Sequence, residues 1–541
     1  MKLKKFVSLG LAAAMMTSIL AACGGSEAAK ESQTKAPETK AAATQTAAQA
    51  APTEAKEESK GITLPLAEAL EYEGLCLVVN EEYPLNENLA WNAIWDRANM
   101  KYEITEIAAT EATEKGNLVM SGGTYPDFLY KMAALDLDKY GQEGSLIPLE
   151  DMIREYAPNL TALLNEKDAW SVITAPDGHI YSLPMIEANL AYGTSFLWWI
   201  NKVWMENVGI TELPTNIDEL HTLLKAFKDQ DANGNGDPND EVVMSFDSNL
   251  YKFLLHYIGD AKMVSYSTNL AIDDGQIVFW PTRDEYKEFL QEMTKWYEEG
   301  LFDETVFTQT NTQFKALAGG QELGFYPNTL PAAPDAGLGN YIQLMPFNRE
   351  NWTRSFGMHK GGLAITDKCE NPEVLIAAFD WLYSVEGGLV ARLGIENTNW
   401  MRQADGTIKT GLGEFKSSYM YQLFGKAAVP ALIPNDYYAN VDYTGNPKKI
   451  SETSSYQEGG IYTFGPVVKD FEYTVEEKEN LSYISTDLNG YVDNYAAEVI
   501  TGKTKLEDTW ETFQETLKRM GVEELVNVNQ TVFDRMYPNG I

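Results

Sequence analysis

The first part of the chain alternates apolar runs with amphipathic segments. Apolar runs or strict alternation predict three strands, over residues 75–80, 102–107 and 128–130. Apolar side chains spaced three and four apart predict helices over residues 89–98 and 111–120, and Gly122-Gly123 ends the second one. This β-α-β-α-β order predicts an α/β fold with a parallel sheet covered by helices.

Two later segments carry helix signals. One places apolar side chains on a single face: Tyr286, Phe289, Leu290, Met293, Trp296 and Tyr297. Helical spacing makes these aromatic residues core residues rather than a binding site. Asn371-Pro372-Glu373 combines an N-cap, a first-turn proline and an acid that suits the helix dipole. The helix it opens is expected to run to about Ser384 and to stop before Gly387-Gly388.

The N-terminal sixty residues follow a different pattern. Three lysines precede an apolar run over residues 6–22, and Leu20-Ala21-Ala22-Cys23 ends it. This arrangement resembles the lipobox of bacterial lipoproteins, which implies a signal over residues 1–23 and lipidation of Cys23. An uncleaved anchor is the alternative, and it also places the protein outside the cytoplasm. Residues 24–60 lack aromatic and large aliphatic side chains, so we expect a disordered tether.

Composition narrows the classes of partner. The chain has 42 Lys and Arg against 79 Asp and Glu, a formal net charge of −37. Such an excess argues against nucleic acid and favours a neutral or cationic ligand, or simple solubility. From residue 61 onward the chain is rich in Trp, Tyr and Phe, and its length predicts two lobes.

The cysteine and histidine residues leave the disulfide pairing open and do not indicate a zinc site. Cys76 lies in a buried-strand pattern and Cys369 lies just before a helix. A bond between them is compatible with an exported protein, and two free thiols are the alternative. The four histidines are scattered and form no zinc-binding pattern.

Short motifs then occur in a characteristic order over some 390 residues. They are Met120 to Asp127 (MSGGTYPD), Ile147-Pro148-Leu149, Tyr156 to Leu160 (YAPNL), Asp177 to Pro184 (DGHIYSLP), Asn371 to Gly388, and Thr501 to Trp510. Together they resemble the extracellular solute-binding proteins of ABC transporters, and the nearest group is the lipoprotein branch that binds oligosaccharides.

The resemblance implies a two-lobed fold of the type II periplasmic-binding-protein kind, with discontinuous lobes and a hinge. One lobe would take residues 61–190 plus 348–405, and the other would take residues 191–347 plus 406–541. The hinge would pass near residues 188–196 and 344–347. Composition and periodicity do not indicate this discontinuity.

An acidic loop follows the amphipathic segment that carries Leu223, Leu224 and Phe227. Oxygen-bearing side chains recur at alternate positions with glycines between them, as hard Ca²⁺ requires. Counting from Asp229 gives an EF-hand pattern with Gly234 sixth, whereas the resembled family implies a register that starts at Asp231. The alternative is a metal-free turn. The candidate ligands of a structural Ca²⁺ are Asp229, Asp231, Asn233, Asn235, Asp237, Asp240 and Glu241.

Ligands of α/β lobes bind beyond the carboxyl ends of strands. Sugars present flat C–H faces to aromatic rings and hydroxyls to carboxylates. A packing role competes with ligand contact for each residue chosen on these grounds. The candidates are Glu82, Tyr83, Asp127, Tyr130, Tyr326, Trp352 and Trp400.

Two function classes remain. The first is a monomeric, lipid-anchored receptor on the extracytoplasmic face of the bacterial membrane, which captures an oligosaccharide by hinge closure and delivers it to ABC permease subunits. The second is an extracytoplasmic glycoside hydrolase, since acidic pairs are abundant. A peptide or another solute is a further alternative. The chain lacks GxSxG and the metal-protease motifs, and the ordered resemblance favours a binding protein over an enzyme.

Overall fold

The computed structural model describes residues 61–78, 84–188, 197–247, 250–254, 262–265, 268–328, 333–344, 347, 354–412, 429–436, 441–442 and 467–541. The predicted signal, the tether and the lipidation site Cys23 lie outside these ranges. So do the candidate ligand residues Glu82, Tyr83 and Trp352.

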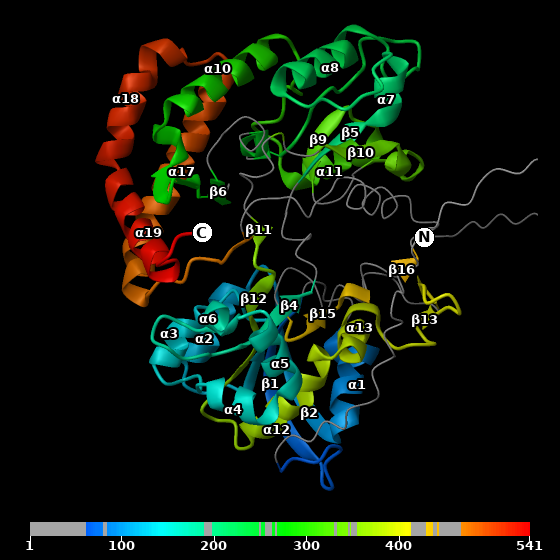
Figure 1. Ribbon diagram of the computed structural model, residues 1–541, viewed down its shortest axis with the longest axis vertical. Helices are drawn as coiled ribbons and strands as arrows, with labels where there is room; N and C mark the ends of the chain where they lie inside the picture. The colour runs from blue at the N-terminus through cyan, green and yellow to red at the C-terminus, as the bar shows by residue number, and fades with distance from the viewer. Residues whose placement is uncertain are drawn as a thin grey trace, which may run out of the picture. The chain divides into compact units, whose positions relative to one another are not determined.

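A six-stranded sheet forms the centre of the first lobe, in the order β15-β4-β12-β3-β1-β2. The strands are β1 (Leu70–Val78), β2 (Met100–Ala108), β3 (Phe128–Tyr130), β4 (Leu183–Glu187), β12 (Met358–Ile365) and β15 (Leu432–Ile433). β1 pairs in parallel with β2 and with β3, as the β-α-β-α-β pattern predicts. β12 runs antiparallel to both β3 and β4. Segments far apart in the chain therefore lie side by side in one sheet (Figure 1).

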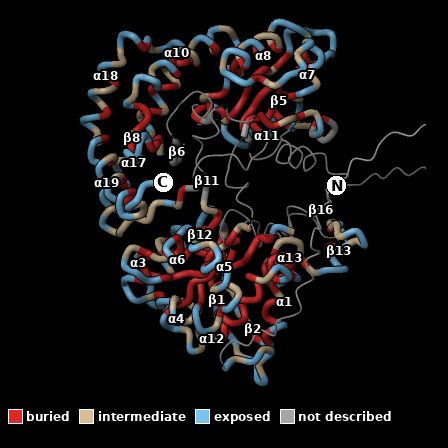
Figure 2. Tube along the Cα trace, viewed as in Figure 1, coloured by how far each residue is buried: buried red, intermediate tan, exposed pale blue. Residues whose placement is uncertain are grey.

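The centre of the sheet is buried on both faces, which explains the continuous apolar run over residues 75–78 of β1. Leu75 and Leu77 join one cluster of buried side chains, and Cys76 and Val78 join another on the opposite face. Figure 2 shows the buried trace along this strand. The first-lobe helices are η1 (Leu85–Glu87), α1 (Leu89–Ala98), α2 (Ala112–Ser121), α3 (Leu137–Gln142), α4 (Glu150–Tyr156), α5 (Pro158–Glu166), α6 (Trp170–Ile173), α12 (Pro372–Asp380), η7 (Trp381–Tyr383) and α13 (Val385–Leu393).

The glycine pair after α12 behaves differently from the expectation. α12 ends at Asp380 and η7 follows, but Gly387 and Gly388 lie inside α13 rather than after a helix end. The Ser384 side chain caps α13 by accepting the Gly387 N–H. A Cβ on Gly388 would lie 2.3 Å from the carbonyl oxygen of Leu432, so this glycine permits close contact between α13 and β15.

The second lobe contains two three-stranded antiparallel sheets, β10-β5-β9 and β6-β7-β8, packed with helices. The strands are β5 (Leu197–Asn201), β6 (Lys262–Ser265), β7 (Leu270–Asp273), β8 (Gln276–Phe279), β9 (Phe325–Asn328) and β10 (Tyr341–Leu344). The helices are α7 (Lys202–Asn207), α8 (Ile217–Asp229), η3 (Leu250–Leu254), η4 (Trp280–Thr282), α10 (Asp284–Glu298), α11 (Asn311–Gly320), η5 (Asp335–Asn340), α17 (Val475–Ile500), α18 (Leu506–Arg519) and α19 (Val522–Met536).

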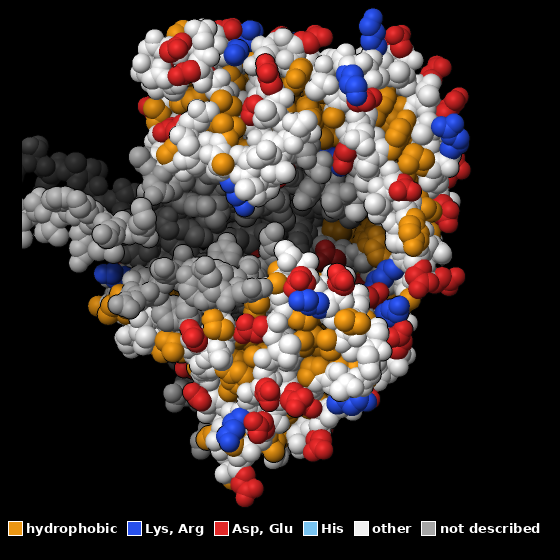
Figure 3. All heavy atoms as spheres, turned by 180° about the vertical axis from the view of Figure 1, so that it is seen from behind, with side chains coloured by type: hydrophobic (Ala, Val, Ile, Leu, Met, Phe, Trp, Pro, Cys, Tyr) orange, Lys and Arg blue, Asp and Glu red, His pale blue; other side chains and the backbone are white. Residues whose placement is uncertain are grey.

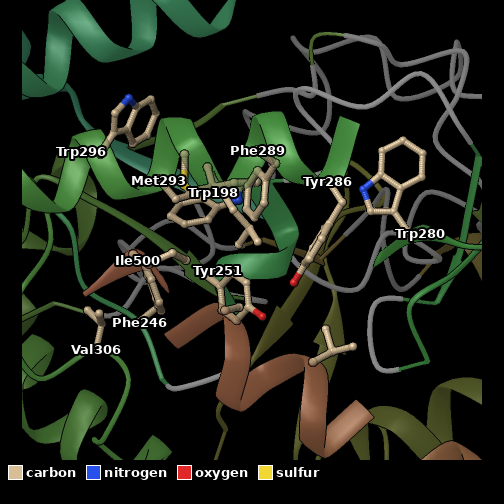
Figure 4. Close-up of a cluster of buried hydrophobic side chains, with 14 of the residues drawn as sticks. Trp198, Phe246, Tyr251, Trp280, Tyr286, Phe289, Met293, Trp296, Val306 and Ile500 are labelled. Atoms are coloured by element: carbon tan, nitrogen blue, oxygen red, sulfur yellow. The ribbon is translucent and has the colours of Figure 1, made fainter. Parts of the chain in front are cut away.

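The predicted apolar face of α10 is the centre of the second-lobe core. Tyr286, Phe289 and Met293 are fully buried there beside Trp198 and Tyr251, as Figure 4 shows. The expectation that these aromatic residues pack is confirmed.

The two large cores draw on discontinuous parts of the chain. The first combines side chains from residues 72–186 with others from 356–432, and the second combines residues 198–344 with 468–533. The first core extends past the predicted limit at residue 405, because Val429, Ala431 and Leu432 pack in it and β15 pairs with β4.

Two minor sheets complete the described structure. They are β13-β14-β16, formed by β13 (Trp400–Arg402), β14 (Ile408–Thr410) and β16 (Val441–Asp442), and the pair of β11 (Arg354–Ser355) with β17 (Val467–Val468). Cys76 and Cys369 are free thiols, the second of the two alternatives. Among the described helices, no single one is long and apolar enough to cross a membrane, and one bent pair, Pro372–Tyr383 with Val385–Leu393, meets the length and composition requirement.

Candidate functional site

Three aromatic residues expected to stack on a sugar are core residues in this structure. Tyr130 is 1% exposed, and its ring centre lies 4.6 Å from that of Trp91. Tyr326 is fully buried, 5.1 Å from the ring of Tyr341. Trp400 is also buried, and its indole N–H donates to the carbonyl of Gly394 at 2.8 Å. Rings that pack against protein on both faces have no free face on which a sugar could stack. The packing role, given above as the alternative for each candidate, therefore applies to these three residues.

The remaining described candidate, Asp127, lies at the opposite edge of the sheet from the one expected. It precedes β3, and its Oδ2 accepts the backbone N–H of Glu73 in β1 at 2.8 Å. Because β1 and β3 are parallel, this contact joins the amino ends of both strands. Ligands of α/β lobes bind beyond the carboxyl ends, so Asp127 fastens strands and does not face that edge.

The structure brings three other polar residues to the carboxyl edge. Lys131 directly follows β3, and Glu187 ends β4. His359 lies near the start of β12, which runs antiparallel and therefore begins where β3 and β4 end. Sequence reasoning missed all three. Their signal is a titratable residue at the end of a buried apolar strand.

Burial perturbs two of these groups. Lys131 is fully buried in a left-handed backbone conformation with φ +59°, and its N–H donates to the carbonyl of Gly362. Desolvation lowers the pKa of Lys131 to about 8, against a smaller opposing effect of Cys76. Desolvation likewise raises the pKa of Glu187, while His359 and Arg392 oppose that rise. Of the two, only Glu187 is not fully buried, so it offers a hydrogen-bond acceptor at this edge.

Two grooves in the described structure lie away from this edge. One of about 500 Å³ is lined by residues 141–148 and by Asp177, His179 and Tyr181, next to the amino end of β4. Its floor is tight, because a Cβ on Gly141 would meet the Tyr181 ring at 2.3 Å. A second groove, of about 560 Å³, lies beside Trp510 in α18. Neither contains a candidate ligand residue.

The surface electrostatics match the composition. On the face drawn in Figure 3, acidic side chains outnumber basic ones over both lobes. This distribution agrees with the net charge of −37 and suits a neutral ligand such as a sugar better than a polyanion.

The acidic loop after α8 gathers four of its seven candidate side chains in one network. Asp231 accepts the N–H groups of Asn235 and Gly236 at 3.0 and 2.8 Å. The side-chain amides of Asn233 and Asn235 each donate to one oxygen of Asp240 at 2.7 Å. This arrangement follows the register that starts at Asp231.

The remaining three candidates differ from one another. Asp229 still belongs to α8 and pairs with Lys225 at 3.1 Å, and Asp237 accepts the N–H of Asn239 at 3.2 Å. Glu241 is buried; one carboxylate oxygen accepts the Ala232 N–H, and the other has no hydrogen-bond partner among the described residues. A buried carboxylate oxygen without a donor costs free energy unless a cation neutralises it, but among the described residues no group of three or more His, Cys, Asp or Glu side chains is arranged to hold a metal ion.

Comparison with known proteins relates the whole fold to one class. The family profile of bacterial extracellular solute-binding proteins matches residues 89–389. The chain is 26% identical over 514 residues to the fructooligosaccharide ABC transporter substrate-binding protein FusA of Streptococcus pneumoniae serotype 4, covering 89% of this chain and 93% of that protein. It is 23% identical to the lipoprotein LipO of Bacillus subtilis over 42% of this chain and 43% of LipO.

Solved structures share the fold. FusA in complex with kestose aligns with a TM-score of 0.67 at 24% identity, covering 87% of this chain and all of FusA. An EF-hand mutant of FusA bound to fructo-nystose aligns with a TM-score of 0.68 over the same shares and at the same identity. A solute-binding protein from Bifidobacterium longum infantis that binds HMO aligns at 0.74 and 19% identity, covering 86% and 99%. The two-lobed α/β fold is therefore of the type II periplasmic-binding-protein kind, and the chain belongs to the family of bacterial extracellular solute-binding proteins.

Proposed function

We propose that this protein is the substrate-binding component of an ABC importer and that it captures an oligosaccharide between its lobes by hinge closure. The supporting observation is the match to FusA over 89% of this chain and 93% of that protein. Because the matched family consists of solute-binding proteins, it favours a receptor over a hydrolase. Closure gives a permease a form of the receptor that differs from the open form.

The carboxyl edge of the first-lobe sheet supplies the binding groups in this proposal. Glu187, which is only partly buried, accepts from sugar hydroxyls. Loss of one such partner leaves hydroxyls unpaired inside the closed protein, at a cost of about 1–3 kcal/mol.

Calorimetry with fructooligosaccharides, kestose among them, and with milk oligosaccharides tests this function. We expect binding of at least one sugar and its intact recovery. Glu187→Gln should weaken binding, whereas Asp127→Asn, at the opposite edge of the same sheet, should leave it unchanged. Hydrolysed sugar would favour the enzyme alternative. Binding of peptides in place of sugars would overturn the solute class.

We propose further that the loop after α8 binds a structural Ca²⁺ through Asp231, Asn233, Asn235, Asp240 and Glu241. The orphaned oxygen of Glu241 supports this, as does the EF-hand of the relative FusA. A cation here would stabilise the folded state by RT ln(1 + [L]/Kd), about 2.7 kcal/mol at a hundredfold excess.

Thermal unfolding with and without chelator tests the metal site. Chelator should lower the melting temperature of the parent, and Asp231→Ala should abolish that response. Asp229→Ala is the matched control, because Asp229 pairs with Lys225 on the helix and should keep the response. Identical melting curves of metal-loaded and metal-stripped parent would refute calcium binding.

The remaining parts of the proposal concern placement in the cell. Cys23 carries the lipid, residues 24–60 form the tether, and the folded part works as a monomer on the extracytoplasmic face of the cell membrane beside its permease subunits. The lipoprotein LipO among the relatives supports this placement.

A further inference from the structure

Residues 467–478, which we name the strap, lead from β17 into α17 and are fastened to the second-lobe helices. The Lys469 N–H donates to the hydroxyl of Tyr537 at 2.6 Å, and the Tyr473 hydroxyl donates to Asn529 at 2.6 Å. Arg535 of α19 donates to the carbonyl of Glu472 at 2.7 Å. Three hydrogen bonds of normal length thus fix the strap to α19 and the residue after it.

The same strap also reaches the first lobe through charged side chains. Lys478 lies 2.8 Å from Asp136 and 3.5 Å from Asp138. Lys360 of β12 lies 3.2 Å from Asp138 and 2.5 Å from Glu472. The five groups form an unbroken chain of alternating sign, in the order Asp136, Lys478, Asp138, Lys360 and Glu472.

Three members of this charge chain are largely shielded from solvent, whereas Asp136 and Lys478 are 34% and 35% exposed. The side chains of Asp138, Glu472 and Lys360 are 11%, 16% and 26% exposed. Salt screens partly buried pairs less than exposed pairs, and removing one member leaves its neighbours buried without compensation. The network should therefore resist displacement as a unit, unlike the exposed pairs elsewhere on the surface.

We propose that the strap is an electrostatic brace between the two cores, which restricts their relative motion and thereby sets the apparent affinity for the solute. The affinity part rests on the proposed receptor function. A brace restricts the ligand-free protein to fewer lobe orientations. It thereby raises the fraction of molecules that are able to close on a solute. Apparent Kd equals the intrinsic value divided by the competent fraction, so loosening the brace weakens binding without touching the site.

Distance measurements between spin labels test the brace in the ligand-free full chain. Labels at Leu118→Cys in α2 and Glu515→Cys in α18 report on one lobe each, because both positions are exposed; Cys369→Ser removes the half-buried native thiol. Lys360→Met and Lys478→Met each break the charge chain. Lys287→Met is the matched control, since its pair with Glu507 at 3.0 Å joins two helices of the same lobe.

We expect Lys360→Met and Lys478→Met each to broaden the distance distribution and to weaken sugar binding about fivefold, the lower end of typical coupling. The control should change neither. If Lys478→Met has a native melting curve and the same distance distribution as the parent, the brace is refuted. This conclusion holds even if Lys360→Met fails to fold. Absence of sugar binding would refute the receptor function alone, because the ligand-free distances still decide the brace.

Discussion

At the scale of single residues, the carboxyl edge of the first-lobe sheet holds charges in surroundings that disfavour them. Lys131 is fully buried with its pKa lowered to about 8, and burial raises the pKa of Glu187. Neither pKa shift reflects a gain in folding stability, because burial removes each group from water and destabilises its charged form. Such costs persist where a function uses the group, and the binding proposal rests on Glu187 because, unlike Lys131, it is not fully buried.

A more exposed pair gives a pH dependence with a definite sign. The hydrogen bond to Glu150 raises the pKa of His179, and burial opposes this weakly. Burial opposes ionisation of Glu150, but hydrogen bonds from His179 and the Ile180 N–H outweigh it and lower its pKa. The histidine contribution is present below its ordinary pKa of about 6.5 and is lost as pH rises through the raised value. The carboxylate contribution is lost as pH falls through the lowered value.

The stability difference between parent and His179→Gln should therefore be largest in mildly acidic solution and should fade in alkaline solution. Solvent screening keeps it below about 1 kcal/mol. Urea unfolding across this pH range measures it. Glu111→Gln, which breaks the exposed pair with Lys115, should give a difference that stays level over the same range. A histidine effect that grows with rising pH would contradict the assignment.

The candidate site could be predicted less well than the residues that pack. The sequence around an aromatic residue does not show whether its ring stacks on a sugar or packs against protein. In the structure all three candidate rings are buried against protein, namely those of Tyr130, Tyr326 and Trp400. Asp127 follows a turn motif, but only the strand pairing shows that it lies at the amino edge. The loop residues from Asp231 to Asp240 were predictable because their contacts are local in sequence.

At the scale of elements, local sequence signals predicted the structure correctly where interactions between neighbouring residues determine it. The Asn88 side chain caps α1 by accepting the N–H groups of Ala90 and Trp91, and the apolar face of α10 is buried as its spacing predicts. The glycine pair in α13 failed for the opposite reason. Gly388 lies against the backbone of β15, which follows more than forty residues later in the chain. No local sequence pattern indicates a contact over that separation.

Two glycines in helices give a matched test of this explanation. Gly388→Ala would place a Cβ 2.3 Å from the Leu432 carbonyl, and overpacking of that kind costs about 1–3 kcal/mol. Gly490→Ala in α17 meets nothing within 4 Å, so it should gain about 0.5–1 kcal/mol from helix propensity. Chemical denaturation of both variants measures the contrast. Equal effects of the two substitutions would show that α13 does not depend on close contact with β15.

At the scale of the whole molecule, each core is assembled from separate parts of the chain. β15 returns to pair with β4, and helices after residue 475 complete the second core. Alternating strands and helices predict the parallel part of the first sheet, but they carry no information about where a chain leaves one core for another. Only resemblance to a family suggested the discontinuity, and even so its limit at residue 405 was too early.

In our proposal, the placement of the whole molecule depends on one side chain, that of Cys23. Lipidation of Cys23 would hold the folded part at the membrane through the tether of residues 24–60. Acyl chains contribute about 0.8 kcal/mol per buried CH₂, so stable attachment follows from the lipid alone when more than one chain is present. Cys23→Ala should therefore move the protein from the membrane fraction to the soluble fraction, with a mass that lacks lipid. Cys369→Ala is the matched control, because it removes a thiol from the folded part and should leave attachment unchanged. A Cys23→Ala protein that stays with the membrane would mean that the apolar run over residues 6–22 remains as an uncleaved anchor.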